Sequence, residues 1–241
     1  MSKLLIAIQY WEGDKAQAMR VAQLMADLEP RHNSDVDFLF SARFDCAHDM
    51  KAVEKVSAKF KVWTYVNKHR RGVGWPSGCN DLWFGTLDHI YDFGSAKFMP
   101  TYDAILTCEA DSSPLGPHWH RTLMNSWRTV NETKIVKVHG AMVRYPAPHI
   151  NGNALFSGDL GFLHRISRQI GGCSPIHGWD FILCPQFKQA GWANCPHIRS
   201  EWQCKTMAPE QIDGYIDAGV SFLHGVKDDS VLEHVRRRFV H

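Results

Sequence analysis

The apolar positions in the first seventy residues follow two alternating patterns. Residues 3–11 form an almost continuous apolar run, which is typical of a strand covered on both faces. Two further short runs, residues 36–40 and 61–66, also indicate strands. Between the runs, apolar residues recur at helical spacing until Pro30, and residues 47–60 indicate a second helix. This order of elements predicts a parallel sheet joined by right-handed crossovers.

Similar elements are expected along the rest of the chain. They are a helix capped by Asn80 or Asp81, a strand over 104–108, a helix over 118–130, a strand over 134–142, a strand with turns over 149–161, a helix that follows Cys173–Pro175 and runs to about Gln189, a strand over 220–226 and a basic terminal helix. We expect residues 195–209 to be irregular. With no repeat or linker, the predicted fold class is α/β, one domain over residues 1–241 with a mostly parallel central sheet flanked by helices.

An acidic pair directly follows the strand predicted at residues 104–108. Glu109 and Asp111 come next, and Pro114 prevents the strand from continuing. Ligands bind outside the carboxyl ends of the strands in open α/β sheets. Residues two apart in an extended segment point the same way, and two like charges this close favour a cation between them. The pair therefore suggests Mg²⁺ or Mn²⁺ with a phosphate-bearing substrate. The alternative is two solvated loop residues.

Composition narrows the class of protein only slightly. The formal net charge is +2, so the chain is no polycation, although residues 68–71 and 236–238 are local basic runs. Seven cysteines without a Cys-x-x-Cys pair argue against a disulfide framework and a zinc knuckle. We find no charged-then-apolar leader and no apolar run that would span a bilayer, so we expect a cytoplasmic protein, in the host cytoplasm if it is phage-encoded.

Three segments, taken in order, resemble the metal-dependent nucleotide-sugar glycosyltransferases of the GT-A fold. Residues 109–111, Glu-Ala-Asp, look like the DxD motif of that family. Residues 149–155, His-Ile-Asn-Gly-Asn-Ala-Leu, are similar to its Asn- and Gly-rich sugar and acceptor segment. Residues 222–228, Phe-Leu-His-Gly-Val-Lys-Asp, look like its late His-Gly-Lys element. The resemblance spans most of the chain and implies a Rossmann-like GT-A domain, with a nucleotide-binding half at 1–115 and an acceptor and sugar half at 116–241.

The resemblance also implies a set of site residues. Asp111 and His224 would bind Mn²⁺ or Mg²⁺, and Glu109, which replaces the first Asp of the motif, would bind the metal, ribose or water. The donor would be a nucleoside diphosphate sugar, with a UDP-sugar the leading expectation, and the enzyme a hexosyl- or pentosyltransferase. Further nucleotide and sugar contacts would be Gln9, Tyr10, Asp14, Ser112, Asn151, Asn153 and Lys227.

Inversion of the sugar would require a carboxylate that takes the proton of the acceptor hydroxyl. Asp180 is the first candidate for this base and Asp159 the second. Asp180 near a predicted helix start is equally consistent with a helix cap, and in a retaining enzyme it would hold the sugar instead.

The leading expectation for the acceptor is a hydroxymethylated pyrimidine in phage DNA. Basic residues beside an aromatic residue suit a nucleic-acid backbone and an unstacked base, and we expect Arg70, Arg71, Trp75 and Arg236 to contact DNA. A polysaccharide, lipid-linked or protein acceptor is the alternative. Two other classes stay open: a nucleotidyltransferase of related fold, which the glycine-poor segment 11–15 disfavours, and a nucleic-acid-binding module without chemistry.

Overall fold

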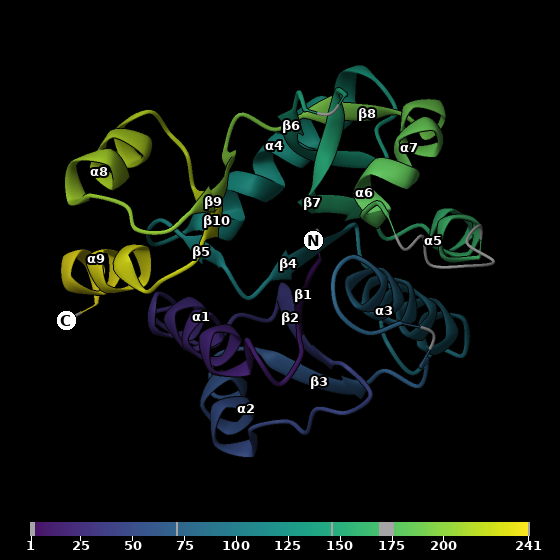
Figure 1. The fold of residues 1–241 in the computed structure, drawn as a ribbon, viewed down its shortest axis with the longest axis horizontal. Helices are drawn as coiled ribbons and strands as arrows, with labels where there is room; N and C mark the ends of the chain where they lie inside the picture. Colours follow the sequence, from purple (N-terminus) through teal and green to yellow (C-terminus); the bar gives the residue numbers. More distant parts are fainter. Residues whose placement is uncertain (1–2, 71, 146, 169–175, 241) are drawn as a thin grey trace.

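The computed structural model describes residues 3–70, 72–145, 147–168 and 176–240, and within them the chain forms one α/β domain (Figure 1). A sheet of seven strands, in the order β3-β2-β1-β4-β7-β6-β8, runs through the molecule. Its strands are β1 (Leu4–Tyr10), β2 (Val36–Ala42), β3 (Lys61–Val66), β4 (Ala104–Glu109), β6 (Val138–Val143), β7 (His149–Ser157) and β8 (Trp192–Asn194). Arg71 and the segment Cys173–Pro175, both named by the sequence analysis, lie outside the described residues.

The strands of this sheet run mostly in one direction, as predicted. Strands β3, β2, β1 and β4 are parallel neighbours, and β6 and β8 are parallel to each other. Strand β7 is antiparallel to both β4 and β6. The carboxyl ends of β1, β2, β3, β4 and β6 therefore lie at one edge of the sheet, together with the start of β7. We call this the carboxyl edge.

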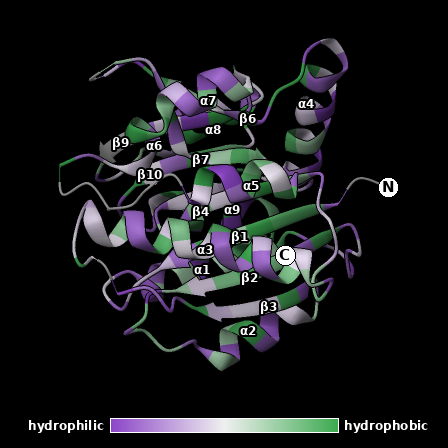
Figure 2. Cartoon of the chain, turned by 90° about the vertical axis from the view of Figure 1, so that its right-hand side faces the viewer, coloured by the Kyte–Doolittle hydropathy of each residue, from purple (hydrophilic) through white to green (hydrophobic). Residues whose placement is uncertain are grey.

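Helices cover both faces of the sheet. Alternate residues of β1 face opposite hydrophobic clusters: Leu4, Ile6 and Ile8 join one, and Leu5 and Ala7 join the other. The first cluster packs against α1 (Lys15–Asp27), α2 (Met50–Ser57), α4 (Trp119–Thr133), α8 (Pro209–Asp217) and α9 (Ser230–Phe239). The second packs against α3 (Ser77–Ser95), α5 (Leu160–Ser167), α6 (Trp179–Ile182) and α7 (Cys184–Ala190). Figure 2 shows the hydrophobic residues concentrated along central strands such as β1 and β7.

A second sheet brings the end of the chain back to the acidic pair. In the part of the chain that the structure describes, it has three strands in the order β5-β10-β9: β5 (Ser112–Pro114), β10 (Phe222–Val226) and β9 (Ile198–Cys204). Strand β5 begins directly after Asp111, and the antiparallel register of β10 places His224 opposite Ser112. The small sheet therefore joins the segment after β4 to the last strand.

Several expected elements differ from those observed. The expected helix over 47–60 is shorter, because the Asp49 side chain caps α2 by accepting hydrogen bonds from two backbone N–H groups. The expected helix that runs to Gln189 is two short helices, α6 and α7, with Leu183 between them. Residues 195–209 contain β9 instead of being irregular throughout. Strands β5 and β8 and helices α5 and α8 were not expected. None of the described helices is long and apolar enough to cross a membrane.

Candidate metal centre and active site

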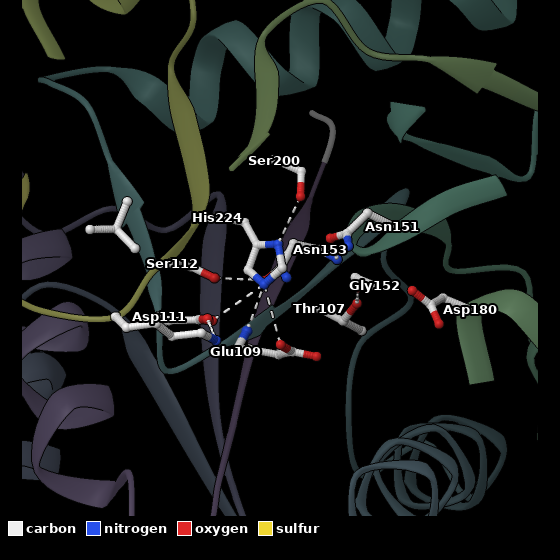
Figure 3. Close-up of polar contacts among 12 residues, drawn as sticks. Thr107, Glu109, Asp111, Ser112, Asn151, Gly152, Asn153, Asp180, Ser200 and His224 are labelled. Carbon is white, nitrogen blue, oxygen red and sulfur yellow. Dashed lines mark hydrogen bonds and ion pairs between the residues drawn. The ribbon is translucent and has the colours of Figure 1, made fainter. Parts of the chain in front are cut away.

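Two carboxylates and an imidazole converge at the carboxyl edge (Figure 3). The Nε2 atom of His224 lies 3.3 Å from Oε2 of Glu109 and 3.3 Å from Oδ1 of Asp111. Asp111 and His224 are buried, whereas the Glu109 side chain is 44% exposed. Among the described residues, this is the one group of three or more His, Cys, Asp and Glu side chains placed to hold a metal ion.

The local structure of β10 explains why two of its polar side chains face the acidic turn. Gly225 has a φ of 100°, a left-handed conformation that favours glycine, and the pairing of β10 with β9 shifts register between His224 and Val226. The backbone N–H of Gly225 donates to the Asp111 carbonyl oxygen at 3.0 Å. This irregularity allows both His224 and Lys227 to reach the Asp111 carboxylate. The His-Gly-x-Lys order therefore brings an imidazole and an ammonium group to the same carboxylate.

The charges at this centre change the protonation of its members. Burial alone would raise the pKa of Asp111, but the adjacent His224 and Lys227 hold it well below the ordinary value. Burial alone would lower the pKa of His224, but the Asp111 and Glu109 carboxylates raise it to about 9. Burial would likewise lower the pKa of Lys227, and Asp111 raises it. In the metal-free protein, the two carboxylates are thus compensated by protonated neighbours.

The donor set fits a divalent cation. One ligand atom from each of Glu109, Asp111 and His224 lies within 4.8 Å of the others, so the three atoms can surround one ion. Carboxylate oxygens suit Mg²⁺ and Mn²⁺, and an added imidazole suits the transition metal of the two. The Nδ1 atom of His224 lies 3.2 Å from the Ser200 hydroxyl, which orients the ring with Nε2 toward the carboxylates.

Hydrogen bonds from β7 hold the acidic turn in place. The side-chain oxygen of Asn153 accepts a hydrogen bond from the Glu109 backbone N–H at 2.9 Å and one from the Ser112 hydroxyl at 2.7 Å. Thr107 donates to the Gly152 carbonyl oxygen at 2.9 Å. Because Asn153 is fully buried and Ser112 is 2% exposed, both side chains support the turn. Asn151 is more accessible, and its side-chain oxygen accepts from the Asn153 backbone N–H at 3.3 Å.

The predicted nucleoside contacts on β1 and in the turn that follows it do not all face the metal centre. Asp14 lies near the centre: burial raises its pKa to about 6, and the charges of Glu109 and Asp111 act in the same direction. Its Oδ1 atom accepts from the Trp11 backbone N–H at 2.8 Å, and its side chain makes no capping hydrogen bond to α1. Gln9 is 7% exposed and pairs in register with Glu109.

Tyr10 does not match the expectation of a nucleoside contact. Since neighbouring residues of a strand point to opposite faces, Tyr10 faces the cluster under α1 and α2 instead of the side of Gln9. It is 1% exposed, and its hydroxyl lies 2.5 Å from Nδ1 of His48. Tyr10 is therefore a core residue.

Asp180 lies beside the centre, with His149 and Glu109 as its neighbouring ionisable groups. It stands in the first turn of α6, and in the view of Figure 3 Gly152 lies between Asp180 and Glu109. Oδ2 of Asp180 lies 3.8 Å from Nε2 of His149. Burial raises the pKa of Asp180 against the opposing effect of His149, and Glu109 raises it further.

Helix α6 is anchored to α3. The side-chain oxygen of Asn80 accepts from the Trp179 backbone N–H at 2.6 Å, and its amide nitrogen donates to the His177 carbonyl oxygen at 3.0 Å. The Trp179 ring stacks on Trp83 with centroids 3.8 Å apart. This packing fixes Asp180 next to the centre. Asn80, expected to cap a helix, instead lies inside α3, which begins at Ser77. The sequence signal for His149 was its position at the start of the Asn- and Gly-rich segment.

The second predicted base, Asp159, is at the wrong edge of the sheet. Because β7 runs antiparallel to β4, its last residue, Ser157, pairs with Ala104 at the start of β4. Asp159 follows Ser157, caps α5 through the Phe162 backbone N–H at 2.8 Å and forms an ion pair with Lys137 at 3.0 Å. It is a helix cap remote from the metal centre.

The predicted DNA contacts do not form one surface. Arg70 is exposed with its guanidinium 5.6 Å from the Phe44 ring centroid, and Trp75 is 74% exposed just before α3. Arg236 is on α9 and pairs with Asp27 of α1 at 3.3 Å. Helices α9 and α3 lie at opposite sides of the molecule in Figure 1.

Comparisons with known proteins identify the fold. No protein-family model and no curated protein matches the chain in sequence. The WbbM bifunctional glycosyltransferase superposes over 97% of this chain and 50% of its own, with a TM-score of 0.56 and 9% identity. The galactosyltransferase LgtC, solved with donor and acceptor sugar analogues, covers 92% and 86%, with a TM-score of 0.54 and 9% identity.

A third similar structure is the glycosyltransferase GlyE of Streptococcus pneumoniae TIGR4. It covers 95% of this chain and 56% of its own, with a TM-score of 0.51 and 12% identity. This chain thus spans about half the length of GlyE and WbbM. The molecule has the fold of the GT-A glycosyltransferases, which confirms the predicted fold class.

Proposed function

We propose that the protein transfers a sugar from a nucleoside diphosphate sugar to an acceptor hydroxyl, with a divalent cation held by Asp111, His224 and Glu109. The observation that carries this proposal is the convergence of His224 with both carboxylates at 3.3 Å, on a GT-A fold. A cation bound there would neutralise the negative charge that develops on the diphosphate leaving group. Mn²⁺ or Mg²⁺ fits the donor set, and UDP is the leading nucleotide.

The remaining residues have roles that follow from their positions. Lys227, half-exposed beside Asp111, adds a positive charge for the diphosphate. Gln9 and Asp14 lie on the nucleotide side, in residues 1–115, whereas His224 and Lys227 come from residues 116–241. Both predicted halves of the domain would therefore contribute to donor binding.

Asp180 is the proposed base for the acceptor proton. Because its pKa is raised, the Asp180 carboxylate can accept a proton at a pH nearer to neutral. Nε2 of His149 lies 3.8 Å from Oδ2 of Asp180 and helps to position this carboxylate. Asn151, partly exposed on β7 near Asp180 in Figure 3, is the proposed sugar contact from the Asn- and Gly-rich segment.

A DNA acceptor has partial support. Arg70 and Trp75 are exposed on the loop after β3, at the carboxyl edge, which suits an incoming acceptor. Arg236 lies away from this loop and is paired with Asp27, so it adds no support.

The test is a thermal-shift and calorimetric screen of nucleoside diphosphates with and without Mn²⁺, followed by donor hydrolysis assays. A ligand that binds only the folded state raises the melting temperature. We expect a nucleoside diphosphate to bind only when Mn²⁺ is present, and His224→Ala to abolish that dependence. Metal-independent binding, or binding that His224→Ala leaves unchanged, would contradict the proposal.

A further inference from the structure

Large hydrophobic side chains exposed to solvent are unevenly distributed over the described part of the chain. Ten such residues are exposed there. Those at the carboxyl edge are Trp11, Met50, Val66, Val73, Trp75, Tyr145 and Ile176, and we call them the apolar rim. The others are Phe93, Phe98 and Ile135, which belong to the far end of α3 and the segment before β6.

The fold explains why the rim residues lie at one edge. Trp11 directly follows β1, and Met50 begins α2, after the connection that leaves β2. Val66 ends β3, and residues 73 and 75 lie between β3 and α3. Because β1, β2, β3 and β4 are parallel, all of these connections emerge at the edge of the sheet where the carboxylates end β4.

The second half of the domain contributes to the same edge. Tyr145 lies in the turn between β6 and β7, which closes at the carboxyl edge because these strands are antiparallel. Ile176 precedes α6, the helix that carries Asp180. The apolar rim therefore borders the candidate active site from both halves of the domain.

The fold itself does not require these side chains to be apolar. Val73, Trp75 and Tyr145 are 67%, 74% and 82% exposed, so they bury little surface in the monomer. Hydrophobic groups clustered around a site, instead of scattered singly, mark a surface that meets an apolar partner.

Cations lie among the rim residues. Lys68 and Arg70 precede Val73, Arg144 precedes Tyr145, and all three are exposed. The guanidinium of Arg43 lies 4.9 Å from the Trp11 ring centroid. Tryptophan and tyrosine beside lysine and arginine is the composition of surfaces that bind the boundary between lipid headgroups and acyl chains.

The rim suits a lipid surface better than a nucleic acid. Met50, Val66 and Val73 are aliphatic and offer no ring on which a base stacks. Scattered cations combined with aliphatic and aromatic side chains match anionic headgroups above acyl chains.

We propose that the apolar rim docks on an anionic lipid surface and that the acceptor hydroxyl belongs to a lipid-linked molecule in that surface. The part of this inference that concerns the acceptor rests on the proposed sugar transfer. Docking would place the carboxyl edge, with Asp180 and the metal centre, against the headgroups. The lipid would thus bring the acceptor to the site without a deep acceptor cavity.

The experiment is flotation of the purified protein with vesicles of phosphatidylcholine and phosphatidylglycerol in equal parts, compared with phosphatidylcholine alone. The double variant Val73→Ser/Tyr145→Ser is compared with Phe98→Ser/Ile135→Ser, whose original side chains are 70% and 78% exposed away from the rim. We expect the rim variant to lose about tenfold or more in vesicle affinity, and the control variant to bind like the wild type.

Several results would overturn the inference. They are absence of vesicle binding, equal losses in both double variants, or binding of a single-stranded oligonucleotide that the rim variant alone loses. Self-association through the rim, seen by light scattering, would also overturn it. Mn²⁺-dependent binding of nucleoside diphosphates, measured on the same samples, separates the two proposals. If it is absent while rim-dependent flotation persists, sugar transfer fails and docking stands; if it is present without flotation, docking fails alone.

Discussion

The imidazole Nε2 of His224 lies 3.3 Å from Oδ1 of Asp111, although one residue is in the last strand of the chain and the other follows the fourth. The contact exists because β5 and β10 pair directly after the acidic turn, and a left-handed Gly225 adjusts the backbone. A metal at this centre would therefore couple the two halves of the domain. Replacement of either His224 or Asp111 should therefore weaken donor binding.

Replacement of Asp111 by asparagine tests the metal assignment. The variant keeps the shape of the side chain but removes the charge that attracts the cation, so Mn²⁺-dependent donor hydrolysis should fall about 100-fold or more. Steady-state kinetics at several Mn²⁺ concentrations measure the effect. Asp159→Asn is the matched control, since its carboxylate lies at the other edge of the sheet and should leave hydrolysis unchanged. Equal losses in both variants would point to general destabilisation.

The pKa of His224 predicts a pH dependence of stability in the metal-free protein. The folded-state pKa of about 9 lies above the ordinary 6.5, so protonated His224 stabilises the folded state. That contribution is fully present below pH 6.5 and is lost as the pH rises through about 9. It is on the order of a few kcal/mol, since one pKa unit corresponds to about 1.4 kcal/mol.

Urea unfolding of wild type and His224→Gln in EDTA, between pH 6.5 and 9.5, measures this contribution. The wild type should lose stability across the interval more steeply than the variant, which lacks the titrating ring. Parallel curves for the two proteins would show that His224 is not protonated beside the carboxylates.

Those parts of the site that lie within one short segment of the chain could be predicted from the sequence. A strand that ends in Glu109-Ala110-Asp111 can be identified from its apolar run. His224 and Lys227 were named only because residues 222–228 resemble the late His-Gly-Lys element of the GT-A family. Strand direction was not accessible in the same way. Because β7 is antiparallel to β4, the start of β7 lies near Glu109, and Asp159, which follows its end, lies at the opposite edge of the sheet.

Hydrogen bonds between side chains and elements that are distant in the sequence could not be predicted from the sequence either. Asn80 holds α6 and Asn153 holds the acidic turn through hydrogen bonds that depend on how helices and strands pack. By contrast, the sequence already placed Tyr10 and Gln9 on opposite faces of the sheet, because neighbouring residues of a strand alternate. Strand alternation therefore already argued against the expectation that both residues contact the same nucleoside.

Replacement of Asp180 by asparagine tests the proposed base. Removal of a general base typically lowers the rate by a factor of about 10² to 10⁴. We expect kcat for transfer to fall by that order while Mn²⁺-dependent nucleoside diphosphate binding is retained, because Asp180 does not belong to the metal centre. A raised pKa also predicts that wild-type kcat rises with pH above the ordinary carboxyl range. A variant with normal kcat and weaker donor binding would assign Asp180 to holding the sugar.

A pair of glycine substitutions tests the packing that fixes the course of β7. In Gly158→Ala the added Cβ would lie 1.9 Å from the Tyr102 carbonyl oxygen, a backbone atom that cannot move aside cheaply. We expect a loss of roughly 1–3 kcal/mol in the free energy of unfolding, as for other overpacked sites. Gly214→Ala is the control, because its Cβ meets nothing within 4 Å on helix α8 and should stabilise by up to about 1 kcal/mol. Urea denaturation of both variants measures the two changes, and a stable Gly158→Ala protein would mean that β7 leaves the sheet by a different path.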